Sequence, residues 1–326
     1  MSANLARTAE GWWLQTPHGM VRLDLAAATT AQLIADRAAL DAAVGVARAA
    51  ATPGDAVPTE SLDLLSPVTA PARVVAQMVN YRSHALDSGM DPDVVPPTFF
   101  RKASGSITGP HGDIVRPEGV GFLDYEVELG LVMGADLPVG TMVAERELHR
   151  YVAALVVTND VSARQIQLTR TQFYEAKSYP TFTPVGPWLT LVDADDLGRL
   201  DRLRLTLSVN GQRRQDSTVQ DMIVRPAKAL TLLSRFQPLS PGDLLLTGTP
   251  GGTALKAPPK IVEMASALLP PATKWRIFFR RQADNPRYLQ DGDVVTAGIA
   301  DPGSGIDPGS GIDLGTQRNV VTSSCR

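Results

Sequence analysis

The stretch Asp124-Tyr125-Glu126-Val127-Glu128-Leu129 alternates acidic side chains with bulky apolar ones. In a β-strand successive side chains point to opposite faces, so this pattern predicts a strand whose Glu126 and Glu128 share one face. A second apolar run, Leu155-Val156-Val157, leads directly into Thr158-Asn159-Asp160. The two runs therefore predict neighbouring strands that bring three carboxylates, those of Glu126, Glu128 and Asp160, toward one point.

Carboxylates that converge in this way repel one another unless a cation lies between them. Ligand sets made only of oxygen suit Mg²⁺, Mn²⁺ or Ca²⁺ better than zinc. Two simpler interpretations stay open at this stage. A Glu-x-Glu pair is also typical of the wet face of a half-exposed strand, and Asp160 is also a residue type that caps the turn after a strand.

Short β-branched or aliphatic runs bounded by Gly, Pro, Asn or Asp predict the strands of the main body. They lie at residues 74–79, 126–133, 154–158, 188–192, 203–209 and 244–247, whereas helices are expected only near 143–152 and 226–236. Many short strands with few helices predict a strand-rich α+β fold built on a curled mixed sheet. The sequence has neither GxGxxG nor GxxxxGK[ST], so no motif supports nucleotide binding.

The first 70 residues predict a small N-terminal α/β domain. Residues 11–24 predict a hairpin around Pro17-His18-Gly19, and 30–51 predict a helix that Thr52-Pro53-Gly54-Asp55 ends. A proline-punctuated linker follows, so we expect the main body to span 71–326. Within that body, 254–289 reads as a proline-flanked insertion with helical character and a basic, aromatic end.

Composition excludes several classes of protein. Of 326 residues, 44% are hydrophobic and 20% charged, which is the balance of a globular chain. A net charge of -3 argues against a nucleic-acid partner, which needs a concentrated basic surface. The single cysteine, Cys325, favours a reducing compartment. The sequence shows no signal peptide and no apolar run of roughly 20 residues, so we expect a cytoplasmic protein without a membrane partner.

Two further residues are candidates for a catalytic role. His84 precedes Asp87 by three positions, and on one helical turn these positions are neighbours. Asp87 would then orient the imidazole as a general base, although a surface histidine with an incidental acid gives the same letters. Lys177 stands alone in its segment, and most lysines are solvated surface residues.

The order of seven motifs resembles the fumarylacetoacetate hydrolase family. Over residues 71–253, and again near Asp291-Gly292-Asp293, the chain carries Asn80-Tyr81-x-x-His84, Asp124-Tyr125-Glu126-Val127-Glu128-Leu129, Asn159-Asp160-x-Ser162-Ala163-Arg164, Lys177-Ser178, Gly186-Pro187-Trp188, Val209-Asn210-Gly211, and Pro241-Gly242-Asp243 followed by Thr247-Gly248-Thr249-Pro250.

This resemblance implies a catalytic domain built as a mixed β-roll and assembled as a homodimer. It implies Mg²⁺ or Mn²⁺ held by Glu126, Glu128 and Asp160. The catalytic residues would be His84 with Asp87, and Lys177. The substrate would contact Tyr81, Gln167 and Thr249, while Arg164 would brace the metal loop.

From these residues we expect a divalent-metal-dependent hydrolase that cleaves a carbon–carbon bond in a β-diketone or acylpyruvate-type keto acid. The expected mechanism uses a metal-bound enolate and water activated by His84. The same scaffold supports a 2-oxo acid hydratase, decarboxylase or isomerase, and a non-catalytic ligand-binding relative is a further alternative.

The sequence departs from the family pattern at two places. Asp87 stands where many members have glutamate, so the dyad with His84 is one methylene shorter. The insertion 254–289 replaces a short loop, and we expect it to form a lid over the substrate; contact with a membrane surface is the alternative.

Overall fold

The structure is a computed structural model that describes residues 2–52, 54–170, 172–258, 270–303 and 311–324. Cys325 and the centre of the insertion, 259–269, lie outside the described residues. The described strands are β1 Ala3–Thr8, β2 Gly11–Thr16, β3 Gly19–Arg22, β4 Val74–Met78, β5 Thr98–Lys102, β6 Ile107–Thr108, β7 Ile114–Arg116, β8 Leu123–Asp124, β9 Val127–Met133, β10 Val152–Asn159, β11 Ser162–Ala163, β12 Thr183–Pro184, β13 Leu189–Leu191, β14 Arg204–Val209, β15 Gln212–Thr218, β16 Leu244–Leu246, β17 Val294–Ala300 and β18 Asp313–Ser323.

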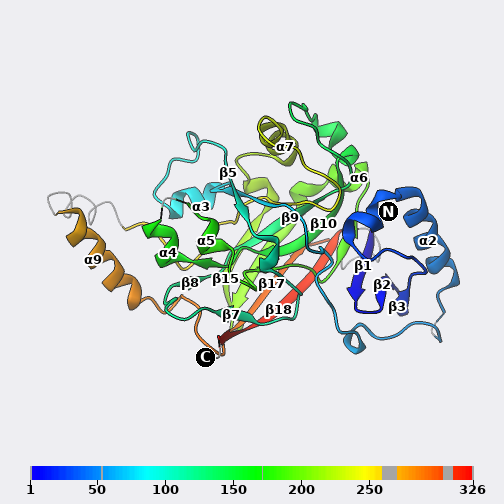
Figure 1. Ribbon diagram of the computed structural model, residues 1–326, viewed down its shortest axis with the longest axis horizontal. Helices are drawn as coiled ribbons and strands as arrows, with labels where there is room; N and C mark the ends of the chain where they lie inside the picture. Colours follow the sequence, from blue (N-terminus) through cyan, green and yellow to red (C-terminus); the bar gives the residue numbers. More distant parts are fainter. Residues whose placement is uncertain (1, 53, 171, 259–269, 304–310, 325–326) are drawn as a thin grey trace.

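The described α-helices are short and lie around the sheets (Figure 1). They are α1 Thr30–Ala35, α2 Arg37–Ala50, α3 Arg82–Asp87, α4 Arg164–Thr169, α5 Tyr174–Lys177, α6 Ala194–Leu197, α7 Pro226–Ser234 and α9 Pro271–Ala283.

Two stacked sheets form the body of the molecule. Among the described residues, the larger sheet has the strand order β3-β2-β1-β13-β10-β9-β16-β4-β5, and the smaller has the order β15-β14-β17-β18-β7. Most neighbours are antiparallel, whereas β16 with β4 and β18 with β7 are parallel. The fold is therefore strand-rich and mixed, as the sequence predicts.

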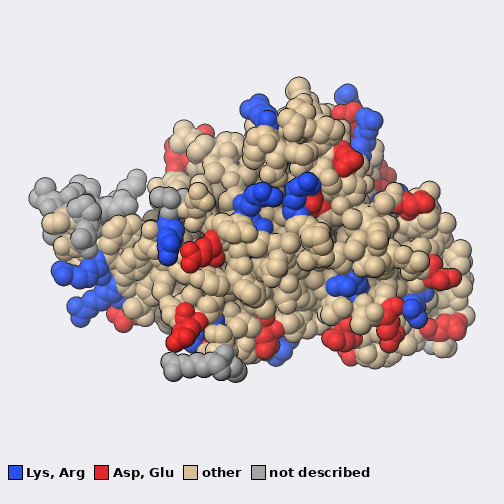
Figure 2. Space-filling view, viewed as in Figure 1, with Lys and Arg blue, Asp and Glu red and all other residues tan. Residues whose placement is uncertain are grey.

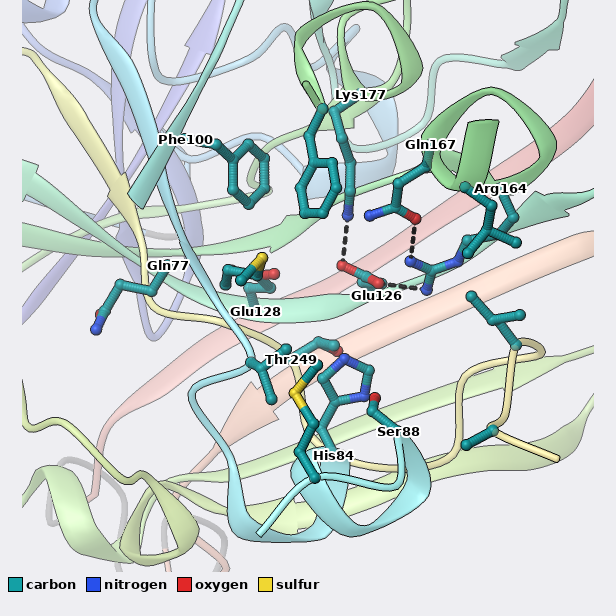
Figure 3. A pocket seen from close by; sticks show the side chains of 17 residues that line it. Gln77, His84, Ser88, Phe100, Glu126, Glu128, Arg164, Gln167, Lys177 and Thr249 are labelled. Atoms are coloured by element: carbon teal, nitrogen blue, oxygen red, sulfur yellow. Dashed lines mark hydrogen bonds and ion pairs between the residues drawn. The ribbon is translucent and has the colours of Figure 1, made fainter. Parts of the chain in front are cut away.

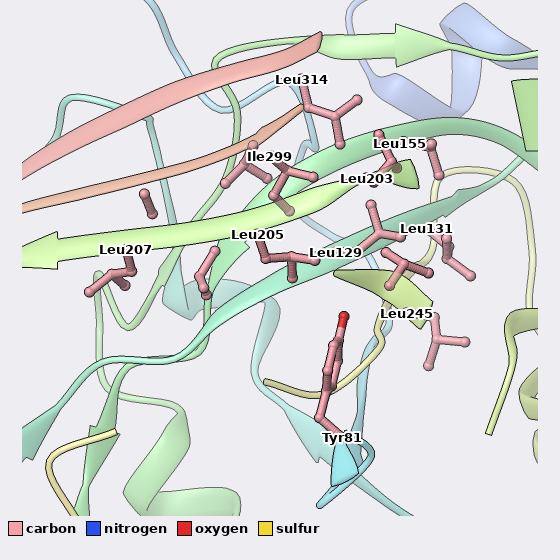
Figure 4. Close-up of a cluster of buried hydrophobic side chains, with 14 of the residues drawn as sticks. Tyr81, Leu129, Leu131, Leu155, Leu203, Leu205, Leu207, Leu245, Ile299 and Leu314 are labelled. Carbon is pink, nitrogen blue, oxygen red and sulfur yellow. The ribbon is translucent and has the colours of Figure 1, made fainter. Parts of the chain in front are cut away.

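Alternation along β9 assigns its two faces to two different cores. The odd-numbered residues from Val127 to Met133 join the core between the two sheets (Figure 4). Val132 instead belongs to the core that packs under α1, α2 and the N-terminal strands. Because side chains alternate, Glu128 and Gly130 lie on the same face as Val132. The carboxylate of Glu128 is thus directed away from the larger core.

The N-terminal strands belong to the larger sheet. β1 pairs with β13 through Ala3 and Leu191, so the sheet continues from the N-terminal hairpin into the body. The core under α1 and α2 also combines residues from both parts of the chain, such as Trp12 and Leu244. The division of the chain at residue 70 stays a prediction, and one sheet runs across it.

Most expected elements are present, with different ends. The hairpin and the helix at 226–236 are confirmed as β2–β3 and α7. The expected helix 30–51 is interrupted at Asp36, whose side chain accepts a hydrogen bond from Ala39 N and caps α2. The helix expected near 143–152 is present as a 3₁₀ helix, Glu145–Arg150, and it is shorter than expected because β10 starts at Val152.

Helix α9, in the insertion, projects from one end of the molecule (Figure 1). Its Phe279 stacks on Phe122 at 5.9 Å between ring centroids, and Phe122 stacks on Tyr288 at 5.1 Å, so an aromatic stack ties α9 to the body. Figure 2 shows Lys and Arg side chains gathered at this end and acids and bases mixed over the rest of the visible face. None of the described helices combines the length and apolar character that crossing a bilayer requires.

The close packing at Gly130 predicts a large effect for a small change. A Cβ atom there would lie 2.6 Å from Val156 Cγ2 and 3.0 Å from Leu244 Cδ1. We therefore expect Gly130→Ala to lower the free energy of unfolding by about 1–3 kcal/mol in urea titrations. Gly45, on the exposed side of α2, has nothing within 4 Å of its would-be Cβ, so Gly45→Ala should stabilise by about 0.5–1 kcal/mol. Equal effects of the two substitutions would contradict this account.

Candidate active site

Strand register brings the three predicted carboxylates together. In the antiparallel pair of β9 and β10, Thr158 lies opposite Glu128, and Asp160 N donates to Glu126 O at 2.8 Å. Glu126, Glu128 and Asp160 therefore share one face at the end of these strands. All three are buried, and one carboxylate oxygen from each lies within 4.8 Å of the others.

Two buried lysines hold this acidic group. Lys177 Nζ donates to Glu126 Oε2 and to Asp160 Oδ2, both at 2.7 Å. Lys102, which ends β5, pairs with the other oxygen of Asp160 and donates to Phe182 O at 3.0 Å. Asp160 is thus bound on both oxygens and has little freedom to rotate.

Arg164 connects the acidic group to Asp124, the last residue of β8. Its guanidinium pairs with Glu126 and with Asp124, where Nε lies 2.8 Å from Oδ2. Asp124 in turn accepts hydrogen bonds from the backbone of Ala254 and Leu255. Arg164 therefore fixes the start of β9 and the start of the insertion in one network, which agrees with its expected bracing role.

The pKa values of two carboxyl groups of the triad, those of Glu126 and Glu128, are shifted in opposite directions. Burial raises the pKa of Glu126, but Arg164 and Lys177 outweigh it and bring the value to about 2. Burial, followed by the charges of Asp160 and Glu126, raises the pKa of Glu128 well above its usual range. Lys177 and the hydrogen bond from Gly248 N, 2.6 Å long, act in the opposite direction but do not outweigh these causes, and Glu128 forms no ion pair with the described cations.

The network fits a divalent cation. Four buried carboxylates, those of Asp124, Glu126, Glu128 and Asp160, face three buried cations, so one negative charge is left over when all are ionised. The excess negative charge lies at Glu128, and three convergent oxygens are the donors that hard cations such as Mg²⁺ or Mn²⁺ prefer. Glu126, Glu128 and Asp160 would hold the ion.

A pocket of about 170 Å³ opens over this network (Figure 3). It is smaller than the roughly 300–1,000 Å³ of sites for drug-sized ligands, so it suits a small molecule. Its polar lining includes six of the predicted site residues: His84, Glu126, Glu128, Gln167, Lys177 and Thr249. Members of the expected metal, acid–base and substrate groups therefore line one cavity, whereas Asp87, Asp160 and Tyr81 are not among its lining residues.

The expected hydrogen bond between His84 and Asp87 is not formed. His84 is buried, and among the described residues its Nδ1 has no hydrogen-bond partner. Asp87 turns instead to the start of the insertion, where it accepts from Gly252 N at 2.9 Å and from Lys256 Nζ at 3.0 Å. The short aspartate side chain is thus used to hold the 251–257 segment. Burial lowers the pKa of His84, so the imidazole is neutral near pH 7.

The predicted substrate-contacting residues divide into two groups. Gln167 and Thr249 line the pocket, and Arg164 Nη1 donates to Gln167 Oε1 at 2.8 Å, which leaves the amide nitrogen pointing into the cavity (Figure 3). Tyr81 does not line the described pocket. Its ring is fully buried in the core between the sheets with Leu129 and Leu245, so a contact between Tyr81 and the substrate stays a prediction (Figure 4).

Sequence reasoning missed Lys102 and the aromatic wall. Phe100 and Lys102 are two apart on β5 and so share a face. Phe100 lines the pocket with Phe173, and the two rings meet edge to face at 5.5 Å. The one usable signal was a lysine two residues after Phe100 in the strand Thr98–Lys102; its partner Asp160 is 58 residues away.

Comparison with known proteins agrees with this geometry. Residues 73–322 match the model of the family described as fumarylacetoacetate (FAA) hydrolase C-terminal. The chain belongs to the fumarylacetoacetate hydrolase family. It is 35% identical over 239 residues, 73% of each chain, to 2,4-didehydro-3-deoxy-L-rhamnonate hydrolase of Sphingomonas sp. (strain SKA58). It is 34% identical over 218 residues, 66% of this chain and 68% of the relative, to a mitochondrial oxaloacetate tautomerase of Bos taurus.

Solved structures share the fold. A fumarylacetoacetate hydrolase from Exiguobacterium antarcticum superposes with a TM-score of 0.70 at 24% identity, over 99% of this chain and 100% of that one. A maleylpyruvate hydrolase from Sphingobium sp. SYK-6 superposes with a TM-score of 0.68 at 23% identity, over 98% and 100%. The mixed β-roll expected from the motifs is therefore confirmed.

The leftover charge at Glu128 predicts how the protein binds Mg²⁺ or Mn²⁺. We expect calorimetric titration to find one ion per chain. Glu128→Gln should weaken its affinity at least roughly tenfold, because affinity follows the charge of the ligand set. Glu145→Gln is the matched control. It removes an exposed carboxylate that is not part of the triad, so the affinity for the ion should stay unchanged. The site is refuted if the wild type takes up neither ion.

The double pairing of Arg164 predicts a structural cost on its removal. Arg164→Met leaves Asp124 and Glu126 buried without their shared cation, so we expect a loss of roughly 3–5 kcal/mol in the free energy of unfolding. Arg170→Met, at the end of the same helix, removes an exposed ion pair of 3.7 Å and should cost less than about 1 kcal/mol. Similar losses in urea titrations of both variants would contradict the assigned role.

Proposed function

We propose that this protein is a divalent-metal-dependent hydrolase that cleaves a carbon–carbon bond in an acylpyruvate or related β-diketone. One observation carries the proposal: His84, whose Nδ1 has no hydrogen-bond partner among the described residues, lines the same pocket as the carboxylates of Glu126 and Glu128. Hydrolysis needs a proton acceptor for water beside a site that stabilises the enolate released. The relatives of the chain are enzymes, among them a hydrolase and a tautomerase.

The charge of the network suits an anionic substrate. With a divalent cation added, the single leftover negative charge becomes one positive charge, which the carboxylate of a 2-oxo acid neutralises. The bound cation would supply Lewis-acid polarisation of a substrate oxygen. Gln167 would orient the substrate through its amide nitrogen, and Thr249 lies on the opposite wall.

The chain's own residues then move the protons. His84 takes a proton from water, and the hydroxide formed adds to the distal carbonyl carbon. Lys177 uses two of its three N–H groups on Glu126 and Asp160, so the third is available to the developing oxyanion. Burial lowers the pKa of Lys177, but Asp160 and Glu126 outweigh it, raise the value and keep the ammonium charged.

The products follow from the electron count. The bond between the attacked carbonyl carbon and the adjacent methylene breaks, and its electron pair stays on the methylene as an enolate. That carbon takes back a proton from the His84 imidazolium. One water is consumed, and an acylpyruvate gives a carboxylic acid and pyruvate.

A second candidate is a tautomerase or isomerase of a 2-oxo acid. It is favoured by the missing contact between His84 and Asp87, because moving a proton along a substrate needs a weaker base than activating water. The 34% identical oxaloacetate tautomerase supports the same alternative. Hydratase and decarboxylase activity use the same pocket and are separated by their products.

Three further features remain part of the proposal. A homodimer is expected from the family resemblance, and a cytoplasmic location fits the single cysteine. The insertion is proposed as a lid: Leu255 and Ala257 at its start line the pocket, although the described helix α9 does not.

Product analysis tests the proposal. With Mg²⁺ or Mn²⁺, we expect acetylpyruvate to give acetate and pyruvate, detected by mass as a gain of one water. A chelator should abolish this reaction, and His84→Ala should lower kcat by about 10²–10⁴-fold, the usual contribution of a general base. Conversion without gain of water, or loss of carbon dioxide, would establish an isomerase or a decarboxylase instead.

We expect His84 and Asp87 to contribute differently to turnover. Because Asp87 contacts Gly252 and Lys256 rather than the imidazole, we expect Asp87→Asn to lower kcat less than roughly tenfold. A loss as large as that of His84→Ala would show that the two residues act as a unit during turnover.

A further inference from the structure

The outer part of the pocket has a mostly apolar wall. It consists of Met78, Val79, Met90, Phe100, Leu168, Phe173, Leu255 and Ala257, to which Gln77 and Ser88 add two uncharged polar groups. Phe100 and Phe173 form the edge-to-face pair, and the Phe100 ring centroid lies 5.5 Å from Lys177 Nζ. The charged groups therefore lie on the floor formed by the carboxylates, and the remaining wall carries no charge.

Each lysine and arginine side chain that lines the described pocket already pairs with a carboxylate. Lys177 is shared by Glu126 and Asp160, and Arg164 by Asp124 and Glu126. Lys256, next to the lining residue Leu255, pairs with Asp87. Within the part of the chain that the structure describes, no lining cation is left to receive a second anionic group at the outer end.

The backbone at Val79 is a separate observation. Val79 lines the pocket with φ of +50°, in the left-handed region that a β-branched residue rarely adopts. Such a conformation persists where the surroundings over-determine it, and it concentrates at ligand sites. A glycine or asparagine would relieve the strain, so the apolar side chain is held at this wall against the preference of its backbone.

The charge count of the network also argues against a second anionic group on the substrate. A divalent cation leaves one positive charge in the network, and the carboxylate next to the 2-oxo group neutralises it. A second carboxylate on the distal end of the substrate would be placed among apolar side chains without a counter-charge, which is costly.

We propose that the acyl group transferred to water is apolar and uncharged, such as a short alkyl chain or an aromatic ring, and that substrates with a second, distal carboxylate are rejected. This inference rests on the proposed function, since it names the acyl substituent of that substrate. The outer wall from Met78 to Phe173 is the subsite that receives it.

The test compares butanoylpyruvate with succinylpyruvate. The two acids have the same carbon chain up to the last position, where one has a methyl group and the other a carboxylate. With the full chain and Mg²⁺, we expect kcat/KM for butanoylpyruvate to exceed that for succinylpyruvate by at least roughly tenfold. Succinylpyruvate cleaved equally well or better overturns the inference and leaves the proposed function standing.

A binding measurement keeps the two proposals distinguishable. The affinity of both acids is measured by calorimetry, on His84→Ala if the wild type cleaves them and on the wild type if it does not. If neither acid is cleaved, the proposed hydrolysis fails, and the affinity ratio still decides the inference: tighter binding of butanoylpyruvate supports it, and equal or weaker binding overturns it. Absence of binding by both acids overturns both proposals.

A variant should reverse the preference. Phe173→Arg adds an unpaired cation to the apolar wall, and we expect it to shift the ratio of affinities toward succinylpyruvate by at least roughly tenfold. Tyr174→Arg adds the same charge at the next residue, which is exposed and does not line the pocket, and should leave the ratio unchanged. If Phe173→Arg does not fold, Met90→Arg places the cation at a lining residue that is already 44% exposed. An unchanged ratio in the folded lining variant overturns the assignment of the subsite.

Discussion

The buried ion network around Asp160 is the constraint on which the rest of the site depends. One oxygen of the Asp160 carboxylate pairs with Lys102 and the other pairs with Lys177, which also pairs with Glu126. Removing any one partner would leave an uncompensated charge in an environment that cannot solvate it. Glu128, with its carboxylate held by the Gly248 amide, is the exception, and its unbalanced charge is what makes the centre suitable for a hard cation.

The sheet register is what makes this network possible. β9 and β10 are long, buried strands, and their apolar residues on the inter-sheet face leave no choice of register, because a slip of one residue would move every side chain to the wrong face. The same register that buries Leu129 against the smaller sheet directs Glu128 to the opposite side. Core packing and site geometry are consequently two results of one strand pairing.

The pocket combines two environments that favour different parts of a substrate. The ionic floor lies beside the imidazole of His84, while Phe100 and Phe173 form an aromatic wall. The low polarity of such a wall strengthens electrostatic interactions near it. The segment 251–257, held by Asp87 and Asp124, contributes Leu255 and Ala257 to the lining and connects the site to the insertion.

The sequence by itself determined the strand-rich fold class and the shared face of Glu126, Glu128 and Asp160, because alternation along a strand is a local property of the chain. That His84, Gln167, Lys177 and Thr249 belong to the same site was implied by the resemblance to the family. Only the tertiary structure decided that Tyr81 points into the core, that Asp87 binds Gly252 and Lys256 instead of His84, and that Lys102 belongs to the network. These outcomes depend on which distant segments meet. A hydrogen bond spanning 165 residues, from Gly252 to Asp87, competes with the local pairing expected from helical spacing and replaces it, and no local pattern records that competition.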